Sequence, residues 1–289
     1  MTSSRPLKFS YEFFPPRTSV MTRRLWRAVG QLERLEPEFF SMTYGALGSD
    51  QQISIDSAIA LHEESPVPVA AHLTCANATR DEIDTVARKF HRAGFNRIVA
   101  LRGDSANQIS SGNAYNGAAE LVKGLRRIAD FDISVAAYPE VHPQASSAAA
   151  DLEYLKRKLD AGANRAITQF FFDADCFLRF RDRAIRIGIE KPVIPGILPI
   201  HNLSKVSSFS QRCGASLPNF YQELFDKTVD DQQAQYRLSV DLAVELCERL
   251  VREGVERIHL YTLNQTDMCL DISLALGANV SSLQMPSAA

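Results

Sequence analysis

Short apolar runs recur along this chain and are separated by stretches with helical periodicity. Each run is apolar at nearly every position, as in parallel strands that are buried on both faces of a sheet. The first seven runs begin roughly 30 residues apart, the length of one strand plus one helix. The predicted strands cover 7–14, 39–44, 67–75, 97–101, 132–138, 165–172, 193–199 and 257–263.

The stretches between these runs repeat apolar residues at the spacing of an amphipathic helix. One of them opens with Thr79 and Glu82, the spacing of a capping box, and Gly94 marks its end. The predicted helices cover 18–35, 50–64, 79–93, 115–129, 146–161, 174–187 and 266–276, and the longer interval 202–253 holds two or three more.

Eight strand–helix units in 289 residues predict an α/β fold, a single (β/α)8 TIM barrel with an extra helical segment between strands seven and eight. The competing fold is an open doubly wound sheet. It is disfavoured because no predicted strand is followed by a G-x-G-x-x-G turn. We expect one catalytic barrel over 1–277 and a disordered tail over 278–289.

The composition narrows the class of protein without identifying it. The chain has 45% hydrophobic and 23% charged residues, as soluble globular proteins do. A net charge of -2 gives no reason to expect nucleic acid or an acidic membrane as partner, and no apolar stretch is long enough to span a bilayer. The N-terminus lacks the apolar core of a signal peptide. The five cysteines have no framework spacing, which favours free thiols and a cytoplasmic location.

A barrel of this kind places its active site at the C-terminal ends of its strands. A metal site built from His72, Cys75 and Asp104 is disfavoured there, because His72 and Cys75 would point to opposite faces of a strand. Hydrolysis by Glu12 and Asp104 needs a carboxylate separation that a sequence does not give. No Ser or Lys holds the position of a nucleophile. Cofactor chemistry assisted by one protein acid remains.

Glu12 is the strongest candidate for that acid. It lies near the end of the first predicted strand, between Tyr11 and Phe13, and Phe14 follows directly. Burial among aromatic rings would favour the protonated carboxylic acid, the form that a general acid needs. The alternatives are an exposed glutamate on an edge strand and a glutamate paired with an arginine.

The sequence resembles the 5,10-methylenetetrahydrofolate reductase family, in motifs that follow the family order from about residue 7 to residue 277. The matching segments are Tyr11–Arg17, Thr43–Ala46, Ala71–Cys75, Ile98–Asp104, Val135–Pro143, Ala166–Phe172, Ile194–Pro199 and Tyr261–Asn264. The length is similar to that of the short bacterial form. The resemblance implies an FAD-dependent, ping-pong reduction of 5,10-methylenetetrahydrofolate to 5-methyltetrahydrofolate by NADH or NADPH, which feeds methionine synthesis. It also implies a homo-oligomer.

The same resemblance implies roles for individual residues. Glu12 would protonate the departing nitrogen of the folate as its bridging carbon opens to a 5-iminium cation, and Asp104 would stabilise that cation. No metal is implied. The expected cofactor-binding residues are Thr43, Ala46, His72, Arg102, Gly103, Asp104, Tyr115, Tyr138, His142, Ala145, Asp151, Arg157 and Lys158. The expected substrate-binding residues are Glu12, Asp104, Gln169, Phe209 and Gln265.

The chain departs from its relatives at three places. The stretch 48–54, which includes Gln51, lacks an arginine common in relatives, Tyr154 replaces an asparagine, and Gln265 replaces an arginine. These departures keep open a catalytically silent paralogue or accessory subunit that binds folate or flavin. A folate-dependent methyltransferase on the same fold is a third hypothesis. The sequence has no Rossmann acidic residue that would select NADH over NADPH.

Overall fold

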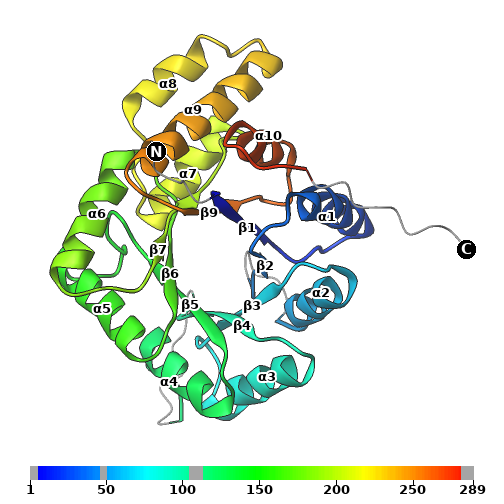
Figure 1. Ribbon diagram of the computed structural model, residues 1–289, viewed down its shortest axis with the longest axis vertical. Helices are drawn as coiled ribbons and strands as arrows, with labels where there is room; N and C mark the ends of the chain where they lie inside the picture. Colours follow the sequence, from blue (N-terminus) through cyan, green and yellow to red (C-terminus); the bar gives the residue numbers. More distant parts are fainter. Residues whose placement is uncertain (1–5, 46–50, 104–112, 281–289) are drawn as a thin grey trace, which may run out of the picture.

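Nine parallel strand segments form one sheet that curls into a barrel, and the helices surround it (Figure 1). The computed structural model describes residues 6–45, 51–103 and 113–280. The strand order in the sheet is β7-β6-β5-β4-β3-β2-β1-β9-β8. The strands are β1 (Lys8–Phe13), β2 (Phe39–Met42), β3 (Val69–Thr74), β4 (Arg97–Leu101), β5 (Asp132–Ala137), β6 (Arg165–Thr168), β7 (Val193–Ile194), β8 (Gly196–Ile197) and β9 (Arg257–Tyr261). The predicted (β/α)8 barrel is confirmed.

The seventh predicted strand, 193–199, is two short segments separated by Pro195. Proline has no backbone N–H to give to a ladder, which explains the break. β7 pairs with β6, and β8 pairs with β9. The Pro195 carbonyl accepts a hydrogen bond from the His259 N–H at 3.0 Å. The two segments at the ends of the strand order are therefore consecutive in the chain. Because one pairs with β6 and the other with β9, together they close the barrel.

The helices follow the predicted order with shifted ends. The helix expected to start at residue 115 begins at Ala118, because Gly117 precedes it at φ +109°, outside helical geometry. The capping box is confirmed: the Thr79 hydroxyl accepts from the Glu82 N–H, and the Glu82 carboxylate accepts from the Thr79 N–H. The helices are α1 (Ser19–Leu32), η1 (Glu33–Leu35), α2 (Gln51–Glu64), α3 (Arg80–Arg92), α4 (Ala118–Ile128), α5 (Ala148–Asp160), α6 (Ala174–Arg186), α7 (Leu203–Cys213), α8 (Asn219–Asp226), α9 (Gln232–Arg252) and α10 (Asp267–Ala275).

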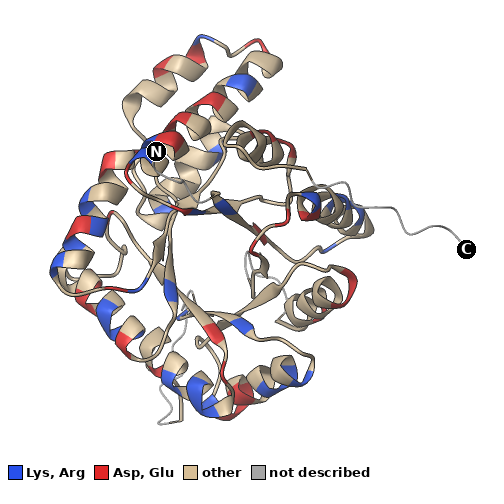
Figure 2. Ribbon diagram, in the orientation of Figure 1, with Lys and Arg blue, Asp and Glu red and all other residues tan. Residues whose placement is uncertain are grey.

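Alternation along the strands divides the core into two parts. On β1, Phe9, Tyr11 and Phe13 are each below 5% exposed and belong to the large cluster between sheet and helices. Ser10 and Glu12 alternate with them and face the barrel interior. A small apolar cluster fills that interior; it is made of Phe39, Ala70, Val99, Ile167 and Ile194, with Leu101 against it. Figure 2 shows that charged residues lie mostly on the outer helices.

The run 165–172 leaves the sheet earlier than predicted, after Thr168. The Thr168 hydroxyl accepts from the Gly196 N–H at 2.9 Å, so a side chain takes over where the ladder ends. Phe170 and Phe172 then pack into an apolar cluster with α7 and α8. These helices, with α9, are the predicted extra segment before β9. Within the described residues, no helix is long and apolar enough to cross a membrane. Most of the predicted tail, 278–289, lies outside those residues.

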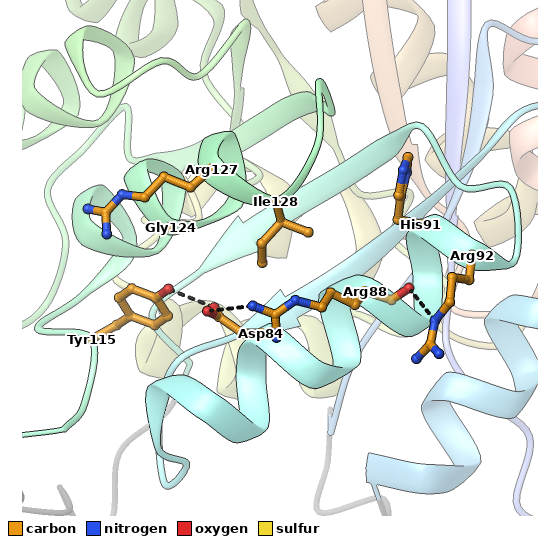
Figure 3. Close-up of a pocket in the computed structure, with 8 residues that line it drawn as sticks. All are labelled: Asp84, Arg88, His91, Arg92, Tyr115, Gly124, Arg127 and Ile128. Atoms are coloured by element: carbon orange, nitrogen blue, oxygen red, sulfur yellow. Dashed lines mark hydrogen bonds and ion pairs between the residues drawn. The ribbon is translucent and has the colours of Figure 1, made fainter.

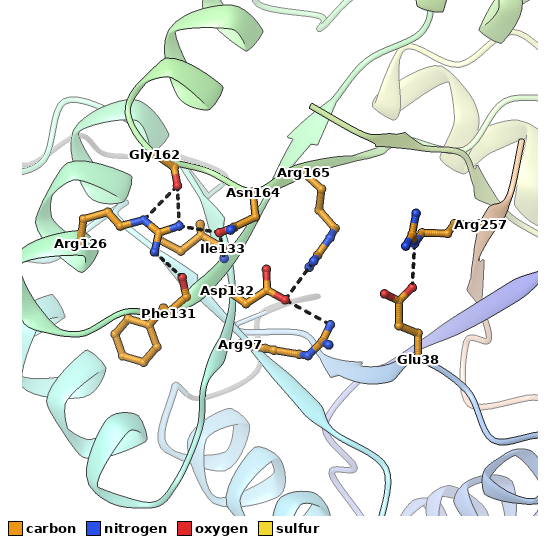
Figure 4. A network of polar contacts seen from close by, with 10 residues as sticks. All are labelled: Glu38, Arg97, Arg126, Phe131, Asp132, Ile133, Gly162, Asn164, Arg165 and Arg257. Atoms are coloured by element: carbon orange, nitrogen blue, oxygen red, sulfur yellow. Dashed lines mark hydrogen bonds and ion pairs between the residues drawn. The ribbon is translucent and has the colours of Figure 1, made fainter. Parts of the chain in front are cut away.

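Ion pairs occupy the N-terminal ends of the strands, opposite the expected active site. The Asp132 carboxylate lies 2.9 Å from the Arg165 guanidinium and 3.4 Å from that of Arg97. Arg257 pairs with Glu38 at 3.1 Å. All five residues lie at or beside the start of a strand (Figure 4). Residues at this end of a barrel usually stabilise the fold and take no part in the chemistry.

Candidate active site

A cavity of about 1470 Å³ lies at the C-terminal ends of the strands. Pockets for single small-molecule ligands in proteins usually measure roughly 300–1,000 Å³, so this cavity has room for more than one ligand. Thirteen sequence-predicted residues line it: Glu12, Thr43, His72, Arg102, Gly103, Tyr115, Tyr138, His142, Ala145, Asp151, Lys158, Gln169 and Phe209. The barrel therefore brings most of the predicted site together from segments far apart in the sequence.

Of the other four predicted residues, two do not border the cavity and two cannot be placed, because they are not among the described residues. Arg157 and Gln265 are both exposed and do not border the cavity. The Arg157 guanidinium instead lies over the Tyr154 ring, 4.9 Å from its centroid. Ala46 and Asp104 fall outside the described residues. The roles expected for these four residues stay predictions.

Glu12 points into the cavity with two histidines beside it. Its Oε2 atom lies 3.4 Å from His72 Nε2 and 3.6 Å from His259 Nε2. Both imidazoles are buried, and neither Nε2 atom has a hydrogen-bond partner. Burial lowers the pKa of His72 below its ordinary value, only partly opposed by the nearby Glu12 carboxylate. One carboxylate oxygen thus faces two buried ring nitrogens.

The sequence analysis places three aromatic rings around Glu12, and for two of them the structure shows that this prediction is wrong. Tyr11 and Phe13 are fully buried on the opposite face of β1, because successive strand residues alternate between faces. The Tyr11 hydroxyl contacts Ser273 Oγ at 2.8 Å, in the helical layer. Only Phe14 joins Glu12 at the cavity. The Glu12 side chain is 20% exposed, so its histidine neighbours define its environment more than apolar burial does.

His259 is a site residue that the sequence analysis missed. It lies in the middle of β9, where it reads as a buried strand residue between Ile258 and Leu260. Its Nδ1 atom lies 2.8 Å from Ser10 Oγ, on the same face of β1 as Glu12. When the Ser10 hydroxyl donates to Nδ1, the ring proton resides on Nε2 and faces Glu12. Alternation along β1 and β9 was the signal that could have found this group.

Gln169 and Phe209 also line the cavity. The Gln169 Oε1 atom accepts from the Phe170 N–H at 3.0 Å, which leaves the amide NH2 group to donate. Phe209, on α7, stacks on Phe170 with ring centroids 5.4 Å apart. The Tyr261 hydroxyl donates to the Thr168 carbonyl at 2.7 Å, and burial raises the pKa of Tyr261 well above its usual value.

Lys158 places a buried amino group at the cavity wall. Its Nζ donates to the Ala136 carbonyl, and burial lowers its pKa to about 8, partly opposed by Asp151. The Asp151 carboxylate accepts from the His142 N–H at 3.0 Å and so fixes the loop after β5. The Tyr154 ring lies under the Lys158 ammonium, 5.2 Å from its centroid.

Tyr115 borders both this cavity and a smaller one of about 560 Å³ between α3 and α4 (Figure 3). Its hydroxyl donates to the Asp84 carboxylate at 2.7 Å, on the side of the smaller cavity. Burial, with help from Asp84, raises the pKa of Tyr115 to about 12. The hydroxyl proton of Tyr115 is therefore used in the hydrogen bond to Asp84, and the Tyr115 ring is the part available for contacts in the main cavity.

The main cavity has features of a ligand site. Thr43 Oγ1 and His72 Nε2 are buried there without hydrogen-bond partners, and buried polar groups normally have one. At Gly103, with φ +86°, a Cβ atom would lie 2.9 Å from the Thr74 Cβ, so only glycine keeps this wall open. Cys75 belongs with Leu73 to the apolar cluster between sheet and helices, whereas the His72 ring faces Glu12 in the interior, which agrees with the predicted opposite-face arrangement. Among the described residues, no three His, Cys, Asp or Glu are grouped to hold a metal ion.

The fold and this cavity define a (β/α)8-barrel protein with a candidate ligand site at the C-terminal ends of its strands. Comparison with known proteins then resolves the family. Residues 2–277 match methylenetetrahydrofolate reductase, and the chain belongs to that family.

Its relatives include bacterial proteins of similar length. The 5,10-methylenetetrahydrofolate reductase of Salmonella typhimurium is 45% identical over 271 residues, which cover 94% of this chain and 91% of that protein. The Escherichia coli enzyme of the same name has the same identity and coverage. A maize methylenetetrahydrofolate reductase (NADH) is 33% identical over 93% of this chain but only 48% of its own length.

A solved structure supports the fold alone. It is an uncharacterized protein from Clostridium thermocellum, described as binding two copies of 5-methyl-5,6,7,8-tetrahydrofolic acid. It aligns with a TM-score of 0.64 over 94% of this chain and 95% of its own, at 15% sequence identity.

Proposed function

We propose that this protein reduces 5,10-methylenetetrahydrofolate to 5-methyltetrahydrofolate with electrons from NADH or NADPH, with FAD as cofactor and in a ping-pong order. Family membership supports the reductase reaction. The observation that carries the assignment to this cavity is the position of Glu12. It faces two buried histidine nitrogens where the strands end.

The residues present fit a flavin nucleotide. Thr43 and His72 offer buried polar atoms without partners, and Gly103 allows close approach to the backbone. Lys158 and Arg102 would meet the phosphates, and Tyr138 and His142 would frame the rings. When bound, FAD would carry a hydride from the nicotinamide nucleotide to the folate.

Glu12 would supply the proton that the folate needs. The bridging carbon accepts a hydride only after one of its two C–N bonds opens, and the departing nitrogen must be protonated for that. A carboxylic acid at Glu12 can donate to that nitrogen, and His72 and His259 can hold the carboxylate that remains. The Gln169 amide NH2, whose carbonyl oxygen accepts from the Phe170 N–H, would donate to an acceptor on the substrate. Asp104 stays a proposed stabiliser of the iminium cation.

The visible spectrum of the purified protein tests this proposal. A bound flavin should bleach when NADH or NADPH is added without oxygen, and its colour should return on addition of methylenetetrahydrofolate. A protein that cannot be loaded with FAD would overturn the proposal. A flavin that bleaches but does not recover would point instead to a silent paralogue.

Three finer expectations belong to the same proposal. We propose a homo-oligomer in the cytoplasm, on the family resemblance and the pattern of cysteines. The product would feed methionine synthesis. Comparing the bleaching rates with NADH and NADPH decides which nucleotide is the electron donor.

A further inference from the structure

The turn that follows β9 has a strained backbone. Leu263 and Asn264 are consecutive, and both have a positive φ, +47° and +53°. Asparagine adopts this left-handed conformation more readily than most residues, whereas leucine seldom does. Such a conformation costs free energy and persists only where the surrounding structure fixes it. Leu263 also lines the main cavity, so the strained turn lies at the candidate active site.

Hydrogen bonds from this turn hold the end of β1. The Asn264 side chain binds both backbone groups of Phe14: its Oδ1 atom accepts from the Phe14 N–H at 3.0 Å, and its Nδ2 atom donates to the Phe14 carbonyl at 2.8 Å. The Thr262 hydroxyl and N–H both donate to the Glu12 carbonyl, at 2.6 and 3.2 Å. The Asn264 N–H in turn donates to the Thr262 hydroxyl at 3.0 Å. The peptide groups from residue 12 to residue 15 are therefore tied to one turn.

The end of β1 depends on these bonds because its pairing with β9 stops at Glu12. Positions 15 and 16 are prolines, which have no N–H to donate to a neighbouring strand. Asn264 is only 3% exposed and Thr262 is fully buried, so water does not compete for the bonds that they make. The direction in which the Glu12 side chain leaves the strand thus depends on the turn.

Asparagine meets both requirements of position 264. It tolerates a positive φ, and its planar amide carries a donor and an acceptor. An aspartate would offer no donor to the Phe14 carbonyl. A glycine would adopt the same backbone without strain but would lose both side-chain bonds to Phe14.

We propose that Asn264 is a positioning residue, which aims the Glu12 side chain at the folate through the backbone of β1. The inference rests on the proposed function, because the folate half-reaction is the one that needs the Glu12 proton. Glu12 lies 3.4 Å from His72 and 3.6 Å from His259, and a shift of its backbone would change both distances. Reduction of the flavin by the nicotinamide nucleotide does not use that proton. Loosening the turn should therefore slow one half-reaction and leave the other unchanged.

Asn264→Gly tests the proposal in stopped-flow experiments on the FAD-loaded protein. The limiting rate of reoxidation by methylenetetrahydrofolate should fall about tenfold, less than the ~10²-fold that a 1 Å misplacement can cost. The folate concentration at half-saturation and the rate of reduction by NADH or NADPH should stay unchanged. The pH profile of reoxidation should move, because Glu12 shifts relative to the two histidines. Independently of activity, hydrogen exchange in the peptide that contains Phe14 should become faster.

Glu36→Gly is the matched control. Glu36 is exposed and also has a positive φ, +50°, but it lies between η1 and β2, at the opposite end of the barrel. Both half-reactions should keep their normal rates in this variant.

Thr262→Val and Thr262→Ser form a second pair of variants, which covers the case in which Asn264→Gly does not fold. Valine keeps the shape of threonine without its hydroxyl, so reoxidation should slow, though less than in Asn264→Gly, because the N–H of residue 262 still holds the Glu12 carbonyl. Serine keeps the hydroxyl, and reoxidation should be normal.

The outcomes separate this inference from the proposed function. Normal reoxidation in both Asn264→Gly and Thr262→Val would overturn the positioning role alone. Equal slowing of both half-reactions, or slow reoxidation in Glu36→Gly, would show a general loosening of the barrel and also overturn it. A higher half-saturating folate concentration at an unchanged limiting rate would make Asn264 a substrate-binding residue instead. Failure of the unaltered protein to reoxidise with methylenetetrahydrofolate would count against the proposed function, and hydrogen exchange would still decide whether Asn264 holds the end of β1.

Discussion

At the scale of single residues, the site depends on how protons are shared around Glu12. His72 is buried with a lowered pKa, so it is neutral near pH 7. A neutral imidazole can accept from a protonated Glu12 or donate to a charged one, and both histidines present Nε2 to the same oxygen. The group can therefore hold Glu12 in either protonation state in one place, as a residue that gives up a proton requires.

His259 is expected to act as a positioning residue for Glu12. In His259→Gln, the rate of flavin reoxidation by methylenetetrahydrofolate should fall roughly tenfold, less than the ~10²–10⁴ expected for the acid itself. Reduction by NADH or NADPH should be unchanged in stopped-flow traces, and the pH profile of reoxidation should move. Ser10→Ala should give a smaller effect in the same direction. An unaltered pH profile would indicate that His259 only fills space.

Burial of neutral His72 predicts a dependence of stability on pH. Its pKa is lowered in the folded state, so below about pH 6.5 the unfolded chain binds a proton that the folded chain does not. Stability present above that pH is therefore lost as the pH falls. Urea unfolding at pH 7.5 and pH 5.5 should show that His72→Asn loses less stability than the unaltered protein, by about 1 kcal/mol. The exposed His91→Asn serves as control; an equal loss in all three proteins would contradict the account.

At the scale of elements, α4 and α5 meet at one glycine beside the cavity. Gly117 precedes α4 at φ +109°, and a Cβ atom there would collide with the Tyr154 hydroxyl from α5. The same Tyr154 ring contacts Lys158 and Arg157. The position of the buried amino group is thus coupled to the start of the neighbouring helix.

Gly117→Ala should destabilise the protein for two reasons, backbone strain and the collision with Tyr154. The strain alone is worth about 1–3 kcal/mol. Gly188→Ala, at φ +82° with open space around it, introduces an alanine at positive φ without a collision. In denaturant titrations the Gly117 variant should therefore be the less stable of the two, and adding Tyr154→Phe should recover part of the difference. Equal stability of the two alanine variants would show that Tyr154 yields without cost.

The order of elements could be predicted from the sequence, and several ends could not. Continuous apolar runs and the Thr79–Glu82 capping box report on local structure, which the sequence encodes directly. The break at Pro195 and the exit of the chain after Thr168 depend on partners in distant strands. Glu12 was found because a carboxylate at a strand end is unusual. His259 was missed because its contacts with Ser10 and Glu12 depend on the pairing of strands that are far apart in the sequence. Strand alternation alone indicated only that His259 faces the barrel interior.

At the scale of the whole molecule, one end of the barrel holds ion pairs that stabilise the fold and the other end holds the cavity. Ion pairs among Arg97, Asp132 and Arg165 join the starts of β4, β5 and β6, away from the cavity at the other end (Figure 4). The side chains are between 16% and 27% exposed, so these charges are partly desolvated. Removing one partner there should cost stability without touching the chemistry.

Asp132→Asn should lower the free energy of unfolding by about 2 kcal/mol, because it leaves two partly buried arginines without a charged partner. The rate of reduction and the KM for folate should stay as they are. Asp130→Asn, which removes a fully exposed partner of Arg126, should change the stability little. A changed KM for folate in a folded Asp132→Asn protein would refute the separation of the two ends.

The central claim is that Glu12 is the proton donor of the folate half-reaction, and Glu12→Gln tests it most directly. The variant keeps the size of the side chain but cannot donate an acidic proton. In stopped-flow experiments its bound flavin should be reduced by NADH or NADPH at the normal rate. Its reoxidation by methylenetetrahydrofolate should be slower by ~10²-fold or more. Reoxidation at the normal rate would contradict the account.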